Sequence, residues 1–199
     1  MEYNSDEQSF EIPKNCNIVI AVSGPPGSGK TTLAQNLARI LGLRYFSTGA
    51  IFRRLAKEKG IPLEELSRIA ETDYSIDRYI DSQAINEARK GRVVLDGHLT
   101  AWIARDYADL LIYVTAPLEI RIQRIAEREN RPFQEVLRET LIREKSEKKR
   151  YKDIYGIDVN DLSIFDLIIN NKRLNSQETL NIALEAVKQV VKKKCRTKQ

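Results

Sequence analysis

Short apolar runs alternate with longer segments of helical period along most of the chain. Runs rich in β-branched residues occupy positions 17–22, 93–95, 110–115 and 165–169, and a further short strand is predicted at residues 44–47. A strand buried on both faces of a parallel sheet reads as a continuous apolar run, whereas a helix carries apolar residues three and four positions apart. The alternation therefore predicts an α/β fold in which helices flank a parallel sheet in three layers.

Two stretches, residues 48–91 and 128–158, are too long and too polar to be simple crossover helices. In folds of this kind ligands bind beyond the carboxyl ends of the strands, so we expect both stretches to be insertions over that end of the sheet. The final helix is predicted to begin at a Ser176 cap, with Glu178 close behind, and to continue into the C-terminal lysines.

The composition indicates one domain of moderate size. The chain has 199 residues, 42% hydrophobic and 31% charged, and no apolar run approaches the roughly 20 residues that a membrane-spanning helix needs. Residues 1–15 are polar and lack the pattern of a signal peptide, so we expect a disordered extension followed by a single domain over residues 16–199. We expect a cytoplasmic monomer that makes no membrane contact.

The net charge of +5 is concentrated in the basic tail, residues 192–199, which holds five basic residues and no acidic one. Basic residues suit the C-terminal end of a helix, and a short terminal run of them is usually solvated. Nucleic acid is therefore not an expected partner.

The cysteine and histidine content is very low, with Cys16 and Cys195 near opposite ends of the chain and His98 as the single histidine. This excludes a zinc site built from cysteine and histidine within the chain. The sequence is compatible with a disulfide between the two cysteines, but the expectation is a pair of reduced thiols.

Residues 24–31 match the phosphate-loop pattern G-x-x-x-x-G-K-[ST] and lie between a predicted strand and a predicted helix over residues 32–41. In such a loop backbone N–H groups converge on phosphate oxygens, Lys30 reaches the outer phosphates of ATP, and the Thr31 hydroxyl binds Mg²⁺. The predicted ATP-binding residues are Gly24, Pro25, Pro26, Gly27, Ser28, Gly29, Lys30, Thr31, Thr32 and Arg124.

A carboxylate for the same metal ion follows the apolar run at residues 93–95, where Asp96 precedes Gly97. An Asp-Gly pair at the end of a strand is also a common turn signal. With a phosphate loop in the chain, the metal-binding interpretation is favoured, so Asp96 and Thr31 are the predicted Mg²⁺ ligands.

Arginines are concentrated between positions 121 and 150. On a helix that starts at Pro117, an apolar stripe would face the core and several arginines would gather on another face. A mobile lid that covers a triphosphate would have this composition, although the interleaved glutamates also fit a solvated helix laced with ion pairs. The predicted catalytic residues are Lys30, Arg128, Arg143 and Arg150.

Taken together, these features resemble the nucleoside monophosphate kinases and, more narrowly, the archaeal-type cytidylate kinases. The narrower likeness rests on residues 48–53 (TGAIFR), on Ile76-Asp77-Arg78 with Gln83, and on a signature over residues 143–166; it covers residues 17–171. It implies a three-layer P-loop kinase fold with a monophosphate-binding insertion and a lid insertion. It also implies transfer of the γ-phosphoryl group of ATP, with Mg²⁺, to CMP or dCMP, which gives CDP or dCDP and ADP.

The resemblance also implies roles for single residues. Arg53 would hold the acceptor phosphate, Thr48 and Asp77 would belong to the same monophosphate site, and the lid arginines would surround the transferred group. His98 is a further predicted member of that site from its chemistry alone, because an imidazole can donate a hydrogen bond to the acceptor phosphate or base. Because the second pKa of a phosphate monoester is about 6, the attacking oxygen is already ionised near neutral pH and no catalytic base is required.

One position departs from the related bacterial enzymes, in which an Arg-Asp pair follows the Asp-Gly and helps to read the base. This chain has His98 and Leu99 there. Two alternatives stay open at this stage. One is a kinase of the same fold that acts on AMP or on several pyrimidine monophosphates, and the other is an adenylate-kinase-like ATPase that serves as an assembly factor on RNA or ribosomal particles.

Overall fold

A computed structural model of the chain describes residues 10 and 12–196. Within this part of the chain, five strands form one parallel sheet in the order β2-β3-β1-β4-β5. The strands are β1 (Val19–Ser23), β2 (Arg44–Ser47), β3 (Val93–Asp96), β4 (Leu110–Thr115) and β5 (Leu167–Asn170).

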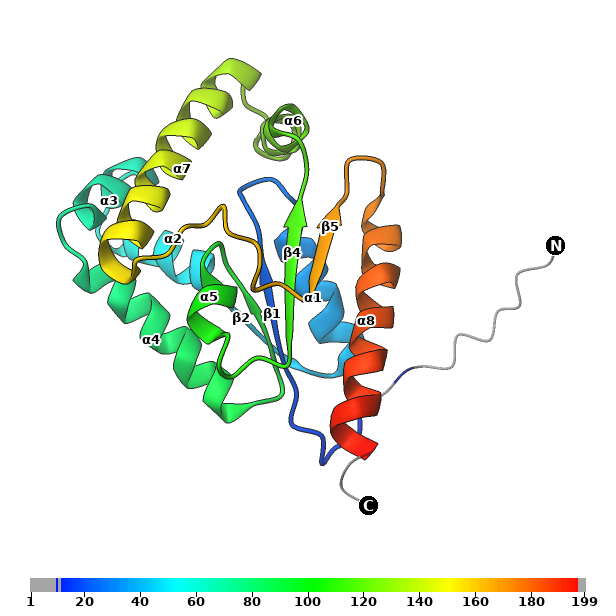
Figure 1. Cartoon of the computed structure of the whole chain (residues 1–199). Helices are drawn as coiled ribbons and strands as arrows, with labels where there is room; N and C mark the ends of the chain where they lie inside the picture. The colour runs from blue at the N-terminus through cyan, green and yellow to red at the C-terminus, as the bar shows by residue number, and fades with distance from the viewer. Residues whose placement is uncertain (1–9, 11, 197–199) are drawn as a thin grey trace.

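Helices cover both faces of this sheet (Figure 1). The side chains of Ile20 and Val22 pack with α1 (Lys30–Leu41) and α8 (Ser176–Arg196) on one face. The alternate side chains of β1, Val19 and Ala21, pack with α4 (Ser75–Lys90) and α5 (Thr100–Ala104) on the other. Successive side chains of a strand point to opposite faces, so a strand that is apolar at every position is buried twice. The predicted three-layer α/β fold is confirmed.

The remaining helices lie toward the carboxyl ends of the strands (Figure 1). They are α2 (Thr48–Glu58), α3 (Leu63–Ala70), α6 (Leu118–Glu129) and α7 (Phe133–Tyr155). Residues 48–91 thus form α2, α3 and α4, and most of residues 128–158 form the single long helix α7. Helix α7 packs against both α3 and α6, so it joins the two inserted regions above the sheet.

Several predicted boundaries are shifted in the structure. Strand β1 begins at Val19 rather than at position 17, and β5 begins at Leu167 rather than at position 165. Phe165 instead packs its ring against Trp102 and Tyr113, with ring centroids 4.9 Å and 5.0 Å away. An aromatic side chain can reach such a cluster from a loop as well as from a strand. The apolar character of Phe165 therefore did not show where β5 begins.

The predicted Ser176 cap of the last helix is wrong. Asn175 caps α8: its Oδ1 accepts a hydrogen bond from the backbone N–H of Glu178 at 2.9 Å, and the Glu178 carboxylate accepts one from the backbone N–H of Asn175 at 2.8 Å. This reciprocal pair is a capping box, which requires a spacing of three residues. Asn175 and Glu178 have that spacing, whereas Ser176 is already the first residue of the helix.

Cys16 and Cys195 form a disulfide in the structure, so the expectation of two reduced thiols is wrong. Cys16 lies just before β1 and Cys195 in the last turn of α8, and their Cα atoms are 5.7 Å apart. Both residues belong to the core on the same face of the sheet, together with Ile12, which is 5% exposed. Packing of α8 on this face therefore brings the two cysteines together.

The terminal predictions are only partly covered by the structure. Residues 1–9 and 11, the main part of the predicted extension, and residues 197–199 of the basic tail lie outside the described residues. Residues 192–196 continue α8. Among the residues that are described, no helix is both long and apolar enough to cross a bilayer.

Candidate active site

The phosphate loop lies between β1 and α1 and is seated directly on the end of β4 and the first turn of α6. Gly24 and Gly27 both have positive φ, at +151° and +76°. A Cβ atom at Gly24 would collide with the carbonyl oxygen of Val114, and one at Gly27 would collide with the backbone of Arg121. Only glycine fits this backbone and this close approach, so the two glycines fix where the loop rests.

The Asp96 carboxylate, at the end of β3, faces the first turn of α1. Its Oδ2 accepts hydrogen bonds from three hydroxyls: Thr31 Oγ1 at 2.9 Å, Tyr45 Oη at 2.8 Å and Ser47 Oγ at 3.2 Å. Its Oδ1 is buried and has no hydrogen-bond partner in the described part of the chain. A buried carboxylate oxygen without a partner is costly, and a cation is the partner that best satisfies it.

This arrangement fits Mg²⁺. The ion usually takes one or two carboxylates and completes its octahedron with substrate phosphates and water, so one free carboxylate oxygen beside the Thr31 hydroxyl is a sufficient protein contribution. Among the described residues, no group of three or more acidic, histidine or cysteine side chains is placed to hold a metal ion. Asp96 and Thr31, the predicted metal ligands, do lie together.

Tyr45 and Ser47 are members of this site that the sequence analysis missed. Both lie on β2, and Ser47 is in register with Asp96 on the neighbouring strand β3. Burial, together with the negative charge of Asp96, raises the pKa of Tyr45 to about 12, so its hydroxyl stays a hydrogen-bond donor. Both residues could have been identified only from the knowledge that β2 and β3 are neighbouring strands that end at the same level. The sequence alone does not give the order of the strands.

A cavity of about 580 Å³ opens between the phosphate loop and helices α2, α3, α6 and α7. It brings together most of the predicted site residues from distant parts of the sequence. The predicted residues that line it are Pro26, Gly27, Gly29, Lys30, Thr31, Thr32, Arg53, Asp96, Arg124, Arg128 and Arg143. Gly24, Pro25, Ser28, Thr48, Asp77, His98 and Arg150 do not line it.

Lys30 lines the cavity and lies close to several charged side chains. Burial lowers the pKa of its ammonium group; the Asp96 charge opposes this shift, while the Arg143 and Arg53 charges add to it. The ammonium group makes one long contact, 3.4 Å, to the carbonyl oxygen of Pro25. A half-buried cation with so little compensation favours an anionic ligand in the cavity.

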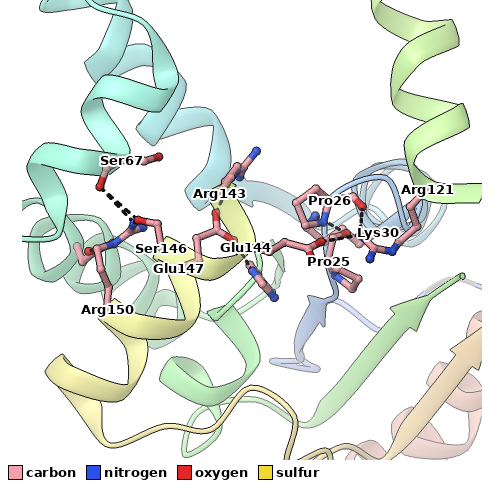
Figure 2. A network of polar contacts seen from close by, with 12 residues as sticks. Pro25, Pro26, Lys30, Ser67, Arg121, Arg143, Glu144, Ser146, Glu147 and Arg150 are labelled. Carbon is pink, nitrogen blue, oxygen red and sulfur yellow. Dashed lines mark hydrogen bonds and ion pairs between the residues drawn. The ribbon is translucent and has the colours of Figure 1, made fainter. Parts of the chain in front are cut away.

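Glu147 of α7 connects Arg143 with His98. One carboxylate oxygen accepts from Arg143 Nε at 2.8 Å, and the other lies 2.6 Å from His98 Nδ1. Burial alone would raise the pKa of Glu147, but the Arg143 and His98 charges hold it well below its usual range, so the carboxylate is ionised. Figure 2 shows Arg143 and Glu147 facing one another on α7. His98 is thus linked to Arg143, which lines the cavity, through Glu147, a residue that the sequence analysis did not single out.

Asp77 and Arg150 lie beneath the cavity and pair with each other. Arg150 is 2% exposed, and its Nε lies 2.7 Å from Asp77 Oδ2. Its Nη1 donates to Ser146 Oγ at 2.9 Å and, at 3.5 Å, to the carbonyl oxygen of Ser67 (Figure 2). Burial raises the pKa of Asp77, although Arg150 opposes this shift. The pair joins α4 and α3 to α7.

Of the remaining predicted site residues, Arg124, Arg128 and Thr48 make contacts with protein groups, whereas Arg53 faces the cavity. Arg124 donates to the side chain and backbone oxygens of Asn171, whose amide in turn donates to the Ser28 carbonyl oxygen at 2.8 Å. Arg128 is exposed and pairs with its neighbour Glu129. Thr48 donates to the backbone carbonyl of Asp96 at 3.3 Å. Arg53 lines the cavity beside Gly49.

A second buried acid on α4 gives a testable pH dependence. Asp81 accepts a hydrogen bond from Tyr155 of α7 at 2.6 Å, and burial raises the pKa of Asp81 to about 7. In the unfolded chain an aspartate titrates near 4. Because the pKa is raised in the folded state, this group's contribution to stability is present below about pH 4 and is lost as the pH rises toward 7.

We therefore expect Asp81→Asn to match the wild-type free energy of unfolding near pH 4 and to exceed it, by up to about 4 kcal/mol, above pH 7. The asparagine cannot ionise, but its amide oxygen can still accept from Tyr155. Urea denaturation of both proteins at intervals from pH 4 to pH 8.5 measures the difference. Stability curves that run parallel over this range would show that Asp81 titrates normally.

A family model described as the cytidylate kinase-like family matches residues 19–173. The chain belongs to this family. Curated proteins named cytidylate kinase are similar to it over most of their length. That of Staphylothermus marinus is 55% identical over 175 residues, which cover 88% of this chain and 99% of the relative. That of Pyrobaculum aerophilum is 50% identical over 168 residues, which cover 84% and 91%.

Solved structures with low sequence identity share the fold of this family member. A shikimate kinase from Acinetobacter baumannii aligns with a TM-score of 0.54 and 19% identity over 87% of this chain and 94% of its own. An uncharacterized protein from Eubacterium ventriosum aligns with a TM-score of 0.63 and 17% identity over 86% and 98%. These likenesses support the P-loop kinase fold.

Proposed function

We propose that this protein transfers the γ-phosphoryl group of ATP to CMP or dCMP, which gives ADP and CDP or dCDP. The observation that carries the proposal is that one cavity holds two groups of charged and polar side chains. The first group, at the phosphate loop, is Lys30, Thr31 and Asp96. The second group consists of two arginines on the inserted helices, Arg53 and Arg143. The family and its cytidylate kinase relatives support the choice of acceptor.

The donor side is the phosphate loop with the first turn of α1. Backbone N–H groups of the loop and the positive end of the helix would bind the β- and γ-phosphates, and Lys30 would neutralise charge on the outer oxygens. Asp96 and Thr31 would hold Mg²⁺, which when bound neutralises the phosphate oxygens of ATP. Arg124 and Asn171 clamp the loop at Ser28, so their contribution to ATP binding would be to fix the loop.

The acceptor side is formed by α2, α3 and the lid helix α7. Arg53 makes no side-chain hydrogen bond or ion pair with any other described residue, so it would hold the acceptor phosphate without giving up a partner. Gly49 and Ser67 line the same wall. Thr48 and His98 lie behind that wall, so we propose that they position it. Glu147 accepts a hydrogen bond from Nε of Arg143. Within the described part of the chain the terminal nitrogens of that arginine make no hydrogen bond, so they would be available for the transferred group.

The chemistry follows from placing two anions in line between these cations. The acceptor phosphate oxygen attacks the γ-phosphorus while the bond to the β-phosphate oxygen breaks, and no proton needs to be removed first. Lys30, Arg53 and Arg143 would stabilise charge on the equatorial oxygens. Arg128, exposed on α6, would join them when α7 closes and excludes water. Asp77 and Arg150 would set the position of α7 and touch no phosphate.

Two coarser features complete the proposal. The cations proposed for the donor and acceptor phosphates, Lys30, Arg53 and Arg143, line one cavity within a single chain, so the proposed reaction needs no second copy and we propose a monomer as the active unit. We also propose a cytoplasmic location, where ATP and nucleoside monophosphates are available. The AMP-kinase and assembly-factor alternatives are not favoured, since the family and the named relatives are cytidylate kinases.

The test is ADP formation from ATP and Mg²⁺ with CMP, dCMP, UMP, AMP or GMP supplied singly, beside a control without acceptor. We expect CMP or dCMP to raise the rate at least about a hundredfold above that control, because a closed site that excludes water hydrolyses ATP slowly. Equal rates with and without acceptor would mean an ATPase. A clear preference for AMP would overturn the assignment of the base while keeping the reaction class.

A further inference from the structure

Arg121, in the first turn of α6, is buried and joins three separate parts of the molecule. It is 7% exposed. Its Nε donates to the carbonyl oxygen of Ala116 at 3.1 Å, and its Nη1 donates to the carbonyl oxygen of Pro26 at 2.9 Å and to Glu144 Oε1 at 2.6 Å. One guanidinium group therefore connects the end of β4, the phosphate loop and the lid helix α7 (Figure 2).

The contact with Pro26 determines how the phosphate loop presents its next donor. A peptide unit is planar and trans, so the carbonyl of Pro26 and the N–H of Gly27 point in opposite directions. Arg121 holds that carbonyl on the side of α6, which turns the Gly27 N–H away from α6. Gly27 also rests on the backbone of Arg121 without space for a Cβ atom. Arg121 thus supports the loop at both Pro26 and Gly27, next to the contact that Asn171 makes with Ser28.

Glu144 brings the lid helix into the same contact. Its carboxylate reaches from α7 toward the phosphate loop, while the adjacent Arg143 is bound to Glu147 one turn further along (Figure 2). The side chains of Glu144 and Arg121 are 17% and 9% exposed, so the ion pair is largely shielded from solvent. A shielded, hydrogen-bonded ion pair is sensitive to the loss of either partner.

We infer that Arg121 and Glu144 form a bridge that fixes the phosphate loop relative to α7, and thereby the distance between the donor phosphates and Arg143. Both are positioning residues, because neither lines the cavity. Arg121 orients the loop directly, and Glu144 acts only through Arg121. The inference rests on the proposed function, because its test by kcat needs the correct acceptor. Its test by binding of an ATP analogue does not depend on which acceptor the enzyme uses.

Three variants test the bridge: Arg121→Met, Glu144→Gln and the double variant. Calorimetry with a non-hydrolysable ATP analogue and Mg²⁺, without acceptor, measures donor binding, and kcat is measured with saturating ATP and CMP. We expect Arg121→Met to raise the Kd of the analogue about tenfold and to lower kcat, since the loop loses its support. We expect Glu144→Gln to lower kcat about tenfold while the Kd changes less than about threefold.

The double variant tests whether Glu144 acts through Arg121. If Glu144 acts through Arg121, adding Glu144→Gln to Arg121→Met changes neither kcat nor Kd further. A double variant whose loss equals the product of the two single losses would overturn the bridge, as would an unchanged kcat in Glu144→Gln. Glu135→Gln is the matched control, because it removes a carboxylate on the same helix that pairs with Arg131 and not with the loop. It should behave as wild type.

Two further outcomes are separated by the design. If Arg121→Met does not fold, judged by its thermal unfolding, Glu144→Gln and Arg121→Lys still test the bridge, because the first is isosteric and the second keeps the charge without the forked geometry. If the wild type phosphorylates no monophosphate, the proposed function fails. The bridge then stands or falls on whether Arg121→Met weakens binding of the analogue.

Discussion

Lys30→Met is expected to lower kcat by roughly a hundred- to a thousandfold, the range observed when one charge-stabilising donor is removed from an active site. The same variant should be more stable than the wild type at neutral pH. Burial lowers the pKa of the Lys30 ammonium group, which means that the folded protein holds this charge at a cost that methionine does not incur. Activity and stability should therefore change in opposite directions.

Steady-state kinetics and the melting temperature, measured side by side, check both parts. Lys57→Met, in the last turn of α2 and outside the cavity, is the matched control and should change neither quantity appreciably. Substantial residual turnover in Lys30→Met would exclude Lys30 from the transfer step. A lower melting temperature would mean that other groups compensate the ammonium charge in the free protein.

Asp96→Asn should have an effect of similar size on kcat, roughly a hundred- to a thousandfold, through the metal ion. Asparagine keeps the shape of the side chain and can still accept hydrogen bonds from Thr31, Tyr45 and Ser47, so the fold should persist. What it removes is the charge on the free oxygen that would bind Mg²⁺. The Mg²⁺ concentration that gives half-maximal activity should rise accordingly.

A magnesium titration of activity measures this shift, and the stabilisation of each protein by ADP with and without Mg²⁺ gives a second reading that does not require turnover. Asp106→Asn, at an exposed position outside the cavity, serves as the control. If the Mg²⁺ dependence of Asp96→Asn is the same as that of the wild type, Asp96 is not a metal ligand.

The parts of the site that lie within one short segment could be predicted from the sequence. The phosphate loop carries its pattern in eight consecutive residues, and Asp96 was identified from a single strand end beside it. The three-layer fold followed from the alternation of apolar runs and helical segments. In each case the physical cause is local: backbone geometry at glycine, or burial of a strand on both faces.

The arginines show where such reasoning reaches its limit. Arg121, Arg143 and Arg150 have similar sequence surroundings, with glutamates and lysines close by. In the structure the first supports the phosphate loop, the second faces the cavity, and the third pairs with Asp77 on another helix. The partners that set Arg121 and Arg150 apart, Pro26 and Asp77, are 95 and 73 residues away in the sequence, and no local pattern identifies them. The Asn175 cap, in contrast, had a readable spacing.

The link between Cys16 and Cys195 makes the chain from one cysteine to the other a closed covalent ring. A protease that cuts one peptide bond within this ring, for example in α7, would open it without releasing a fragment. The cut protein would therefore keep its full mass under non-reducing conditions and separate into two pieces only after reduction. A force that pulls the two chain termini apart would also pass from Cys16 to Cys195 through the disulfide. Strand β1 would therefore not be pulled out of the sheet by such a force.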